Sequence, residues 1–203
     1  MLLVRSDRLI QTFALAISIL TFVSAAQAEQ IRIAAFGTSA TYGRYLPRND
    51  AYPAKLERVL RAKGYDVVVS NAGLSGDFAV TALGRLDSAV PRGTHIAIVE
   101  FGVNEVKLKG LDPATIRKDV GTLVARLRER GVHVLLVDYA QLNLAGVAQE
   151  NGADTFQYPN YLHRDPKYLI PNDPLRHLNA AGWDLVVASM VPLVEAAIAK
   201  VRH

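Results

Sequence analysis

Four short segments of the chain carry groups suited to acyl transfer by a serine. Ser39 lies on a glycine-containing turn that can leave its hydroxyl and its own N–H in the open. Gly76 offers a backbone N–H that a ligand can approach freely, and the amide of Asn104 is a neutral donor suited to an oxyanion. His177 supplies a base, with Asp173 as a nearby carboxylate. A nucleophile, a base with an orienting acid, and oxyanion donors are the components of serine-based acyl transfer.

Each of these residues also has a purely structural interpretation. Ser39 and Gly76 can be ordinary turn residues, Asn104 can cap its own loop, and His177 can pack at the start of a helix. The other histidines begin predicted strands, lie in a polar loop or end the chain (His95, His133, His163, His203). The order and the common location of the four segments favour chemistry over four unrelated turns.

The elements that position these residues are predicted from alternating apolar runs. Strands are predicted at 31–36, 65–72, 95–101 and 132–139, with a weak strand at 154–158. Helices are predicted at 51–63, 78–89, 113–130 and 142–150, and from 179 to the C-terminus. Strands joined by helices imply right-handed crossovers and a parallel sheet covered on both faces. We therefore predict an α/β fold, a single three-layer α/β/α domain with about five parallel strands.

The location of the four segments within this predicted sheet is what links them. In open α/β sheets, ligands bind beyond the carboxyl ends of the strands. Ser39, Gly76 and Asn104 each follow a predicted strand, and His177 precedes the last helix. The four segments are therefore expected to meet at one edge of the sheet.

The N-terminus has the pattern of a secretory signal peptide. Arg5 and Arg8 precede an apolar stretch at 13–23, which ends in the small-x-small sequence Ala-Gln-Ala before Glu29. The apolar stretch is well short of the roughly 20 residues needed to span a bilayer. The pattern predicts a signal peptide at 1–28 and a domain at 29–203. The protein is then exported, either periplasmic or secreted, without stable membrane insertion after cleavage; its oligomeric state is left open.

Composition excludes several other chemistries. The 203 residues contain no cysteine, which rules out a thiol nucleophile, disulfides, iron–sulfur clusters and thiolate zinc sites. The formal net charge is +4, but acids and bases are interspersed without a basic run, so no nucleic-acid partner is expected. The chain also lacks a His-Glu-x-x-His motif, a P-loop and a Gly-x-Gly-x-x-Gly motif. No metal or other cofactor is therefore expected.

The segments FGTSATYG, NAGLSGD, VEFGVNE and HLNAAG resemble, in this order, the conserved blocks of the SGNH or GDSL-type hydrolases. With AYPAKLERVLRAKG and RGVHVLLVDY, the resemblance covers nearly all of 29–203 and points to the bacterial branch of lysophospholipases, arylesterases and acyl-CoA thioesterases. It implies a flavodoxin-like architecture, Ser39 as nucleophile and His177 as general base. It also implies an oxyanion hole formed by the N–H groups of Ser39 and Gly76 and the side chain of Asn104. The implied activity is hydrolysis of small-molecule carboxylic esters or thioesters through an acyl-enzyme.

Three positions depart from the family pattern. Thr38 replaces the aspartate of Gly-Asp-Ser, which is not the triad acid, so the change is expected to affect loop hydrogen bonding. Glu105 stands where aspartate is usual. The family acid lies three residues before the histidine, where this chain has Pro174; Asp173 lies four before, so the turn must bulge by one residue. The alternatives are a backbone carbonyl that assists the histidine, or Asp165 from the preceding loop.

Other functions fit parts of the same pattern. A carbohydrate O-acetyl esterase would use the same fold and residues. A non-catalytic binding or accessory protein would explain the shifted acid and Thr38. A serine hydrolase of the α/β-hydrolase type is disfavoured, because the chain has no Gly-x-Ser-x-Gly elbow. The loop at 159–172 can form a lid over the site. Aromatic residues near the four segments can either line a substrate pocket or pack a loop: Tyr42, Tyr45, Phe156, Tyr158, Tyr161 and Tyr168.

Overall fold

The fold is a five-stranded parallel sheet between two layers of helices. The computed structural model describes residues 29–139 and 141–202, so the predicted signal peptide lies outside the described residues. The strands are β1 (Ile31–Gly37), β2 (Val67–Gly73), β3 (Ile96–Glu100), β4 (His133–Val137) and β5 (Asp154–Phe156). They are arranged in the order β2-β1-β3-β4-β5, and all neighbouring pairs are parallel. The predicted α/β class and the flavodoxin-like strand order are confirmed.

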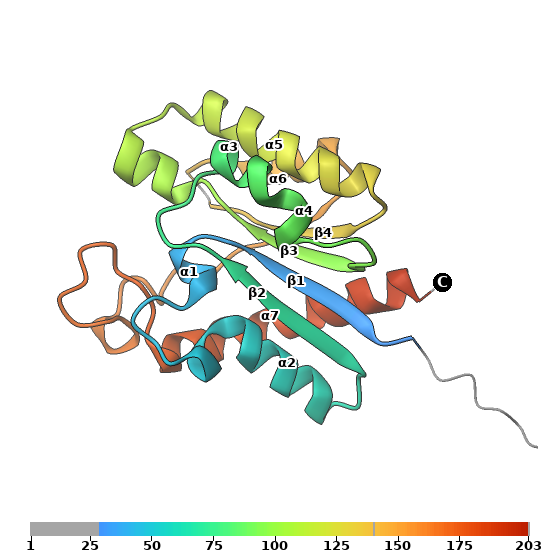
Figure 1. Cartoon of the computed structure of the whole chain (residues 1–203). Helices are drawn as coiled ribbons and strands as arrows, with labels where there is room; N and C mark the ends of the chain where they lie inside the picture. Colours follow the sequence, from blue (N-terminus) through green and yellow to red (C-terminus); the bar gives the residue numbers. More distant parts are fainter. Residues whose placement is uncertain (1–28, 140, 203) are drawn as a thin grey trace, which may run out of the picture.

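Helices cover both faces of the sheet (Figure 1). One face carries α2 (Tyr52–Ala62) and α7 (Ala180–Val201), and the other carries α3 (Ala79–Ala82), α4 (Leu86–Ala89), α5 (Pro113–Glu129) and α6 (Leu144–Glu150). Successive strand residues point to opposite faces. Ile33 and Ile98 therefore join the core on the α2 and α7 side, whereas Phe36 and Val99 join the core under α5. Burial on both faces explains the near-continuous apolar runs in the sequence.

The helix predicted at 78–89 is interrupted. It consists of α3, a 3-10 turn η2 (Leu83–Arg85) and α4. The turn contains Gly84, which is a poor helix former, and Arg85, whose guanidinium binds groups at the strand ends. Short elements near the strand ends complete the described fold: α1 (Ser39–Tyr42), η1 (Arg48–Asp50), a π-helical turn η3 (Glu105–Lys109) and η4 (Pro166–Tyr168).

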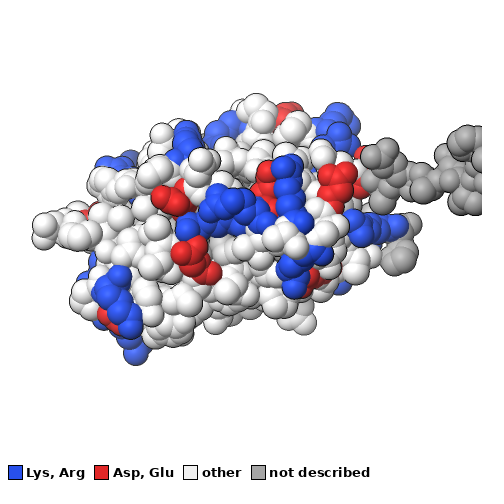
Figure 2. Space-filling model, turned by 90° about the horizontal axis from the view of Figure 1, so that it is seen from below, with Lys and Arg blue, Asp and Glu red and all other residues white. Residues whose placement is uncertain are grey.

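The distribution of charge on the surface agrees with the interspersed acids and bases of the sequence. On the face formed by α2 and α7, basic and acidic side chains are interspersed (Figure 2). Within the described residues, no helix is both long and apolar enough to cross a bilayer.

Candidate active site

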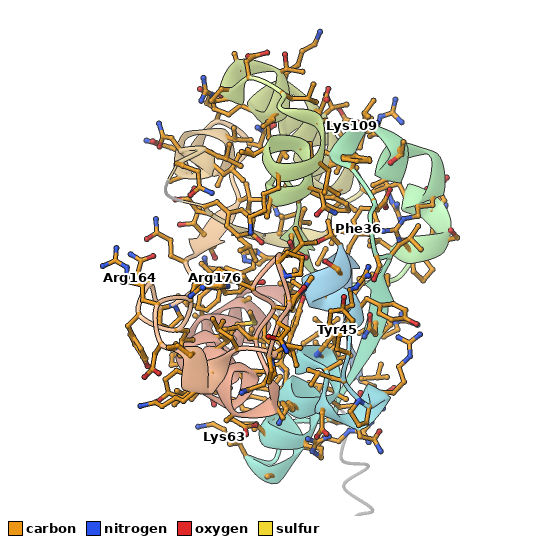
Figure 3. The ribbon with its side chains drawn as sticks, turned by 90° about the vertical axis from the view of Figure 1, so that its left-hand side faces the viewer. Phe36, Tyr45, Lys63, Lys109, Arg164 and Arg176 are labelled. Carbon is orange, nitrogen blue, oxygen red and sulfur yellow. The ribbon has the colours of Figure 1, made fainter. Side chains whose placement is uncertain are left out.

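Two of the predicted site residues, Ser39 and Asn104, follow the carboxyl ends of the neighbouring strands β1 and β3. Gly37 at the end of β1 pairs with Glu100 at the end of β3. The other neighbour of β1 is β2, whereas β3 continues toward β4, so the strand order changes direction between β1 and β3. Such a switch point is where open α/β sheets bind ligands. Ser39 begins α1 directly after β1, and Asn104 lies in the turn after β3. Figure 3 views the molecule from this end.

Ser39, His177 and Asp173 form one hydrogen-bonded chain. Ser39 Oγ lies 2.7 Å from His177 Nε2, and His177 Nδ1 lies 2.6 Å from Asp173 Oδ2. Ser39 is 6% exposed, and the side chains of His177 and Asp173 are 9% and 2% exposed. The structure thus brings the predicted nucleophile, base and acid together, with all three side chains largely buried.

A turn allows Asp173 to reach the histidine ring from four residues away. The N–H of Arg176 donates to the Asp173 carbonyl at 3.0 Å, and Arg176 has a φ of 58°, in the left-handed region. This extra residue returns the chain, so that the backbone N–H of His177 also donates to Asp173 Oδ2, at 2.6 Å. Burial favours the neutral acid. The hydrogen bonds from the backbone and ring of His177 outweigh it and hold the pKa of the Asp173 carboxyl below its usual value.

The alternative acid, Asp165, is engaged elsewhere. Its carboxylate accepts a hydrogen bond from the backbone N–H of Lys167 at 3.1 Å and pairs with the Lys167 ammonium at 3.0 Å. These contacts cap the short η4 turn. Asp173 is therefore the carboxylate that the structure places against His177.

Asn104 lines the cavity with Ser39, and it contacts the turn that carries Gly76. Asn104 is 4% exposed and lines the same cavity as Ser39; its Nδ2 donates to the Asp77 carbonyl at 2.9 Å, which orients the amide. One of its two N–H groups remains for a ligand. Gly76 has a φ of 81° and open space where a Cβ would lie. Gly76 does not line the cavity itself, but the carbonyl held by Asn104 belongs to the next residue.

Arg85 joins the turn after β1 to the turn after β2. Its guanidinium donates to the carbonyl oxygens of Gly37 and Ala72, at 3.1 and 2.8 Å, and to Asp77 Oδ2 at 2.7 Å. The Asp77 carboxylate is only 5% exposed. A single side chain therefore fixes the turn that carries Ser39 relative to the turn that carries Gly76.

Glu105, in place of the usual aspartate, has a similar structural role. It is 1% exposed, and its two oxygens accept the backbone N–H groups of Ala79 and Gly102 at 2.6 and 3.0 Å. These bonds join the loop after β3 to the start of α3. The longer side chain thus still satisfies two backbone donors.

Glu100, which the sequence did not single out, lies directly against the turn that carries Ser39. It is 1% exposed and accepts hydrogen bonds from Thr38 N–H and Thr38 Oγ1 at 3.0 Å, from Thr41 Oγ1 at 3.0 Å and from Tyr139 OH at 2.7 Å. Burial raises the pKa of Glu100, and these donors oppose the rise. A Cβ at Gly37 would collide with this carboxylate and with Thr41. Thr38 was expected to disturb hydrogen bonding in this loop, but its N–H and its Oγ1 both donate to Glu100.

The Glu100→Gln variant is expected to lower the free energy of unfolding by about 2–4 kcal/mol. The glutamine amide would turn its own N–H groups toward the hydroxyl and backbone donors that the carboxylate now accepts from. Those donors would then be buried without an acceptor. Urea denaturation followed by circular dichroism measures the change. Glu129→Gln, at an exposed position on α5, is the control and should change stability by less than about 0.5 kcal/mol. Equal stability of the two variants would contradict this role of Glu100.

A cavity of about 340 Å³ opens beside Ser39 and His177. Its wall includes the predicted Tyr158, together with Tyr139 and Trp183, which the sequence did not indicate. Tyr158 and Trp183 are 8% and 2% exposed and form the inner part. Lys107, Arg164 and Arg176 also line the cavity but are exposed. Tyr45 lies across the site, with its ring 5.9 Å from that of His177 (Figure 3).

The other predicted aromatic residues have different positions. Phe156 packs in the core, Tyr168 packs against it, and Tyr161 is 54% exposed. Segment 159–172 is held by buried Leu162 and Leu169, and its residues Asn160, His163 and Arg164 line the cavity. Among the described residues, no group of three or more histidines or carboxylates could hold a metal ion.

Comparisons with known proteins identify a family and a similar esterase. Residues 35–199 match the model of the GDSL-like lipase/acylhydrolase family. Esterase TesA of Pseudomonas aeruginosa is 30% identical over 124 residues, or 61% of this chain; the chain spans 59% of the length of that relative.

Two solved structures are similar over most of the fold. The crystal structure of TesA has a TM-score of 0.74 at 19% identity and covers 82% of this chain and 99% of its own, which shows a shared fold. AlinE4, an SGNH-hydrolase family esterase, has a TM-score of 0.65 at 28% identity and covers 84% of this chain and 97% of its own.

Proposed function

The chain belongs to the GDSL-like lipase/acylhydrolase family, as the four sequence segments predicted, and on that premise we propose that it is a serine hydrolase of carboxylic esters or thioesters. The observation that carries the proposal is the 2.7 Å contact between Ser39 Oγ and His177 Nε2, with Asp173 against the other ring nitrogen. A serine hydroxyl is a weak nucleophile until a base accepts its proton. This arrangement supplies the base and holds it in orientation.

The proposed reaction proceeds through an acyl-enzyme at Ser39. His177 Nε2 accepts the hydroxyl proton as Oγ attacks the carbonyl carbon, and Asp173 stabilises the imidazolium that forms. The N–H groups of Ser39 and Gly76 and the amide of Asn104 stabilise the oxyanion. One such donor typically contributes about 3 kcal/mol in the transition state. His177 then protonates the leaving group, and water attacks the acyl-enzyme with His177 again as base.

A carbohydrate O-acetyl esterase is the second candidate. The cavity is lined by the neutral polar side chains of Gln141, Gln157 and Asn160 beside the aromatic wall, which suits the hydroxyl groups and apolar face of a sugar ring. This reading uses the same Ser39 chemistry but restricts the acyl group to acetyl.

We also propose that the protein is exported after cleavage before Glu29, on the basis of the sequence pattern at 1–28.

Labelling with a fluorophosphonate tests the proposed nucleophile. Peptide mass spectrometry of the native protein should locate one adduct, on Ser39, since only this hydroxyl has a histidine beside it among the described serines. The Ser39→Ala variant should remain unlabelled, whereas Ser88→Ala, at an exposed position on α4, should be labelled like the wild type. Absence of an adduct on Ser39 in the folded protein would favour a non-catalytic binding protein instead.

Chain-length selectivity then separates the two hydrolase candidates. Rates on p-nitrophenyl esters of two, eight and sixteen carbons are compared with release of acetate from acetylated sugars. Turnover of the longer esters supports the general esterase. Activity confined to acetylated sugars would replace it with the O-acetyl esterase.

A further inference from the structure

Three exposed cations line the cavity that contains Ser39 and His177. Lys107 comes from the π-helical turn after Asn104, and Arg164 and Arg176 come from the segment before α7. We call these three residues the cationic rim. Figure 3 shows Arg164 and Arg176 on the same side of the carboxyl-end face, with Tyr45 nearer its middle. The rim therefore gathers positive charge from two separate parts of the fold at one opening.

In the part of the chain that the structure describes, no acid neutralises a rim cation. Within the described ranges 29–139 and 141–202, none of the three forms an ion pair with a carboxylate. Two of them, Lys107 and Arg176, act on His163 on the same wall. Burial lowers the pKa of the His163 imidazole, and the charges of Lys107 and Arg176 lower it further.

Two carboxylates also line the cavity, but they are buried and occupied. Glu100 is held by Thr38, Thr41 and Tyr139, as described above. Asp138 is 5% exposed and accepts hydrogen bonds from Leu144 N–H at 2.6 Å and Gln157 Nε2 at 2.7 Å. The acids therefore lie within the protein, whereas the solvent-facing charges of the cavity are positive.

Backbone contacts hold two of the cations in place. Lys107 Nζ donates to the Leu175 carbonyl at 3.1 Å. Arg176 donates through Nε and Nη2 to the carbonyl of His163, which leaves three of its five N–H groups for another acceptor. Its left-handed backbone is a conformation that non-glycine residues seldom adopt and that clusters at functional sites. Lys107 and Arg176 are thus held in position before a ligand arrives.

We propose that the cationic rim binds an anionic group, a phosphate or a carboxylate, in the leaving part of the substrate. This inference rests on the proposed ester hydrolysis at Ser39. The buried aromatic part of the cavity, at Tyr158 and Trp183, suits the acyl part. The exposed rim then faces the part that leaves. Anions bind guanidinium and ammonium groups through charge-assisted hydrogen bonds, and guanidinium matches phosphate and carboxylate in shape.

Matched pairs of esters that differ in charge test this inference. One pair is 4-acetoxybenzoate and 4-acetoxybenzamide; the other is the monobutyrate of glycerol 3-phosphate and the monobutyrate of glycerol. The measured quantity is the ratio of kcat/KM for the anionic ester to that for the neutral ester. Differences in intrinsic reactivity cancel when this ratio is compared between variants. The pair whose ratio falls further in the rim variants identifies the preferred anion, carboxylate or phosphate.

The Lys107→Gln/Arg164→Gln double variant is expected to lower this ratio by about tenfold, and each single variant by about threefold. Lys107→Arg should keep the ratio, because it keeps the charge. Raising the ionic strength should also lower the wild-type ratio, since salt screens exposed charges. Arg126→Gln removes the same charge from an exposed position on α5 and should leave both rates unchanged.

The outcomes separate this inference from the proposed function. An unchanged ratio in the double variant, with the neutral esters still hydrolysed, would overturn the role of the rim alone. A wild-type ratio that does not fall with rising ionic strength in either pair would do the same. Failure of the wild type to hydrolyse any ester, with Ser39 unlabelled, would overturn the proposed function and this inference with it.

Discussion

The His177→Ala variant is expected to lower kcat on a p-nitrophenyl ester by about a million-fold, the size of loss seen when a serine nucleophile loses its base. Ser39 Oγ has its hydrogen-bond contact with His177 Nε2, at 2.7 Å. Without the imidazole, the hydroxyl must lose its proton to water, and the leaving group has no positioned acid. Stopped-flow or burst kinetics, with active protein quantified by mass spectrometry, measure the loss.

A matched histidine controls for this effect. His133 also contacts a carboxylate, with Nε2 2.9 Å from Asp154 Oδ2, but it lies at the start of β4, away from the cavity. His133→Gln should keep kcat within about twofold once folded protein is counted. The Ser39→Ala/His177→Ala double variant should be no slower than either single variant, because the two residues act as a unit. Activity of His177→Ala above 1% of the wild type would contradict its assignment as the base.

The Asp173→Asn variant is expected to lower kcat by about ten thousand-fold, with a smaller effect on KM. Asp173 Oδ2 lies 2.6 Å from His177 Nδ1 and accepts the proton that this nitrogen carries. An asparagine can present an N–H there, which favours the wrong tautomer, and it provides no negative charge for the imidazolium. Steady-state kinetics with a short p-nitrophenyl ester measure the change in kcat and KM separately.

Asp165→Asn is the control for this prediction, since Asp165 pairs with Lys167 and was the rival acid in the sequence. It should retain wild-type kcat. A large loss there, together with a mild effect of Asp173→Asn, would reverse the assignment.

The pH dependence of stability offers a second readout at Asp173. The pKa of this carboxyl is lowered in the folded protein, so the folded state binds its proton less readily than the unfolded chain. Its stabilising contribution is therefore present above the ordinary carboxyl pKa and is lost as the pH falls through the lowered value. Asp173→Asn should remove this part of the acid destabilisation.

The sequence was informative where a local pattern determines structure. Apolar runs such as 31–36 and 95–101 predicted strands, because burial on both faces requires continuous hydrophobicity. The parallel order then brought Ser39 and Asn104 to one edge, since both follow central strands. Both residues lie at the start of the short helical element that follows the strand.

Features that depend on distant contacts had no sequence signal. Glu100 ends a strand with no visible partner, yet it binds residues 38, 41 and 139 from two other segments. Trp183 lies in the last helix, and the sequence alone could not distinguish a cavity-lining residue there from an ordinary core residue. The reach of Asp173 depends on the left-handed backbone of Arg176, and arginine has no preference for that conformation. The positions of these residues are determined by tertiary packing and not by the local sequence.

The hydrogen bonds of Arg85 have a consequence for redesign of this protein. They tie the turns after β1 and β2 together, so an engineer who alters either turn changes the alignment of both. Residues 159–172, in contrast, form part of the cavity wall and carry none of the five residues proposed for chemistry. Libraries for new substrates belong in that segment, with Arg85 and its three partners left as a constant frame.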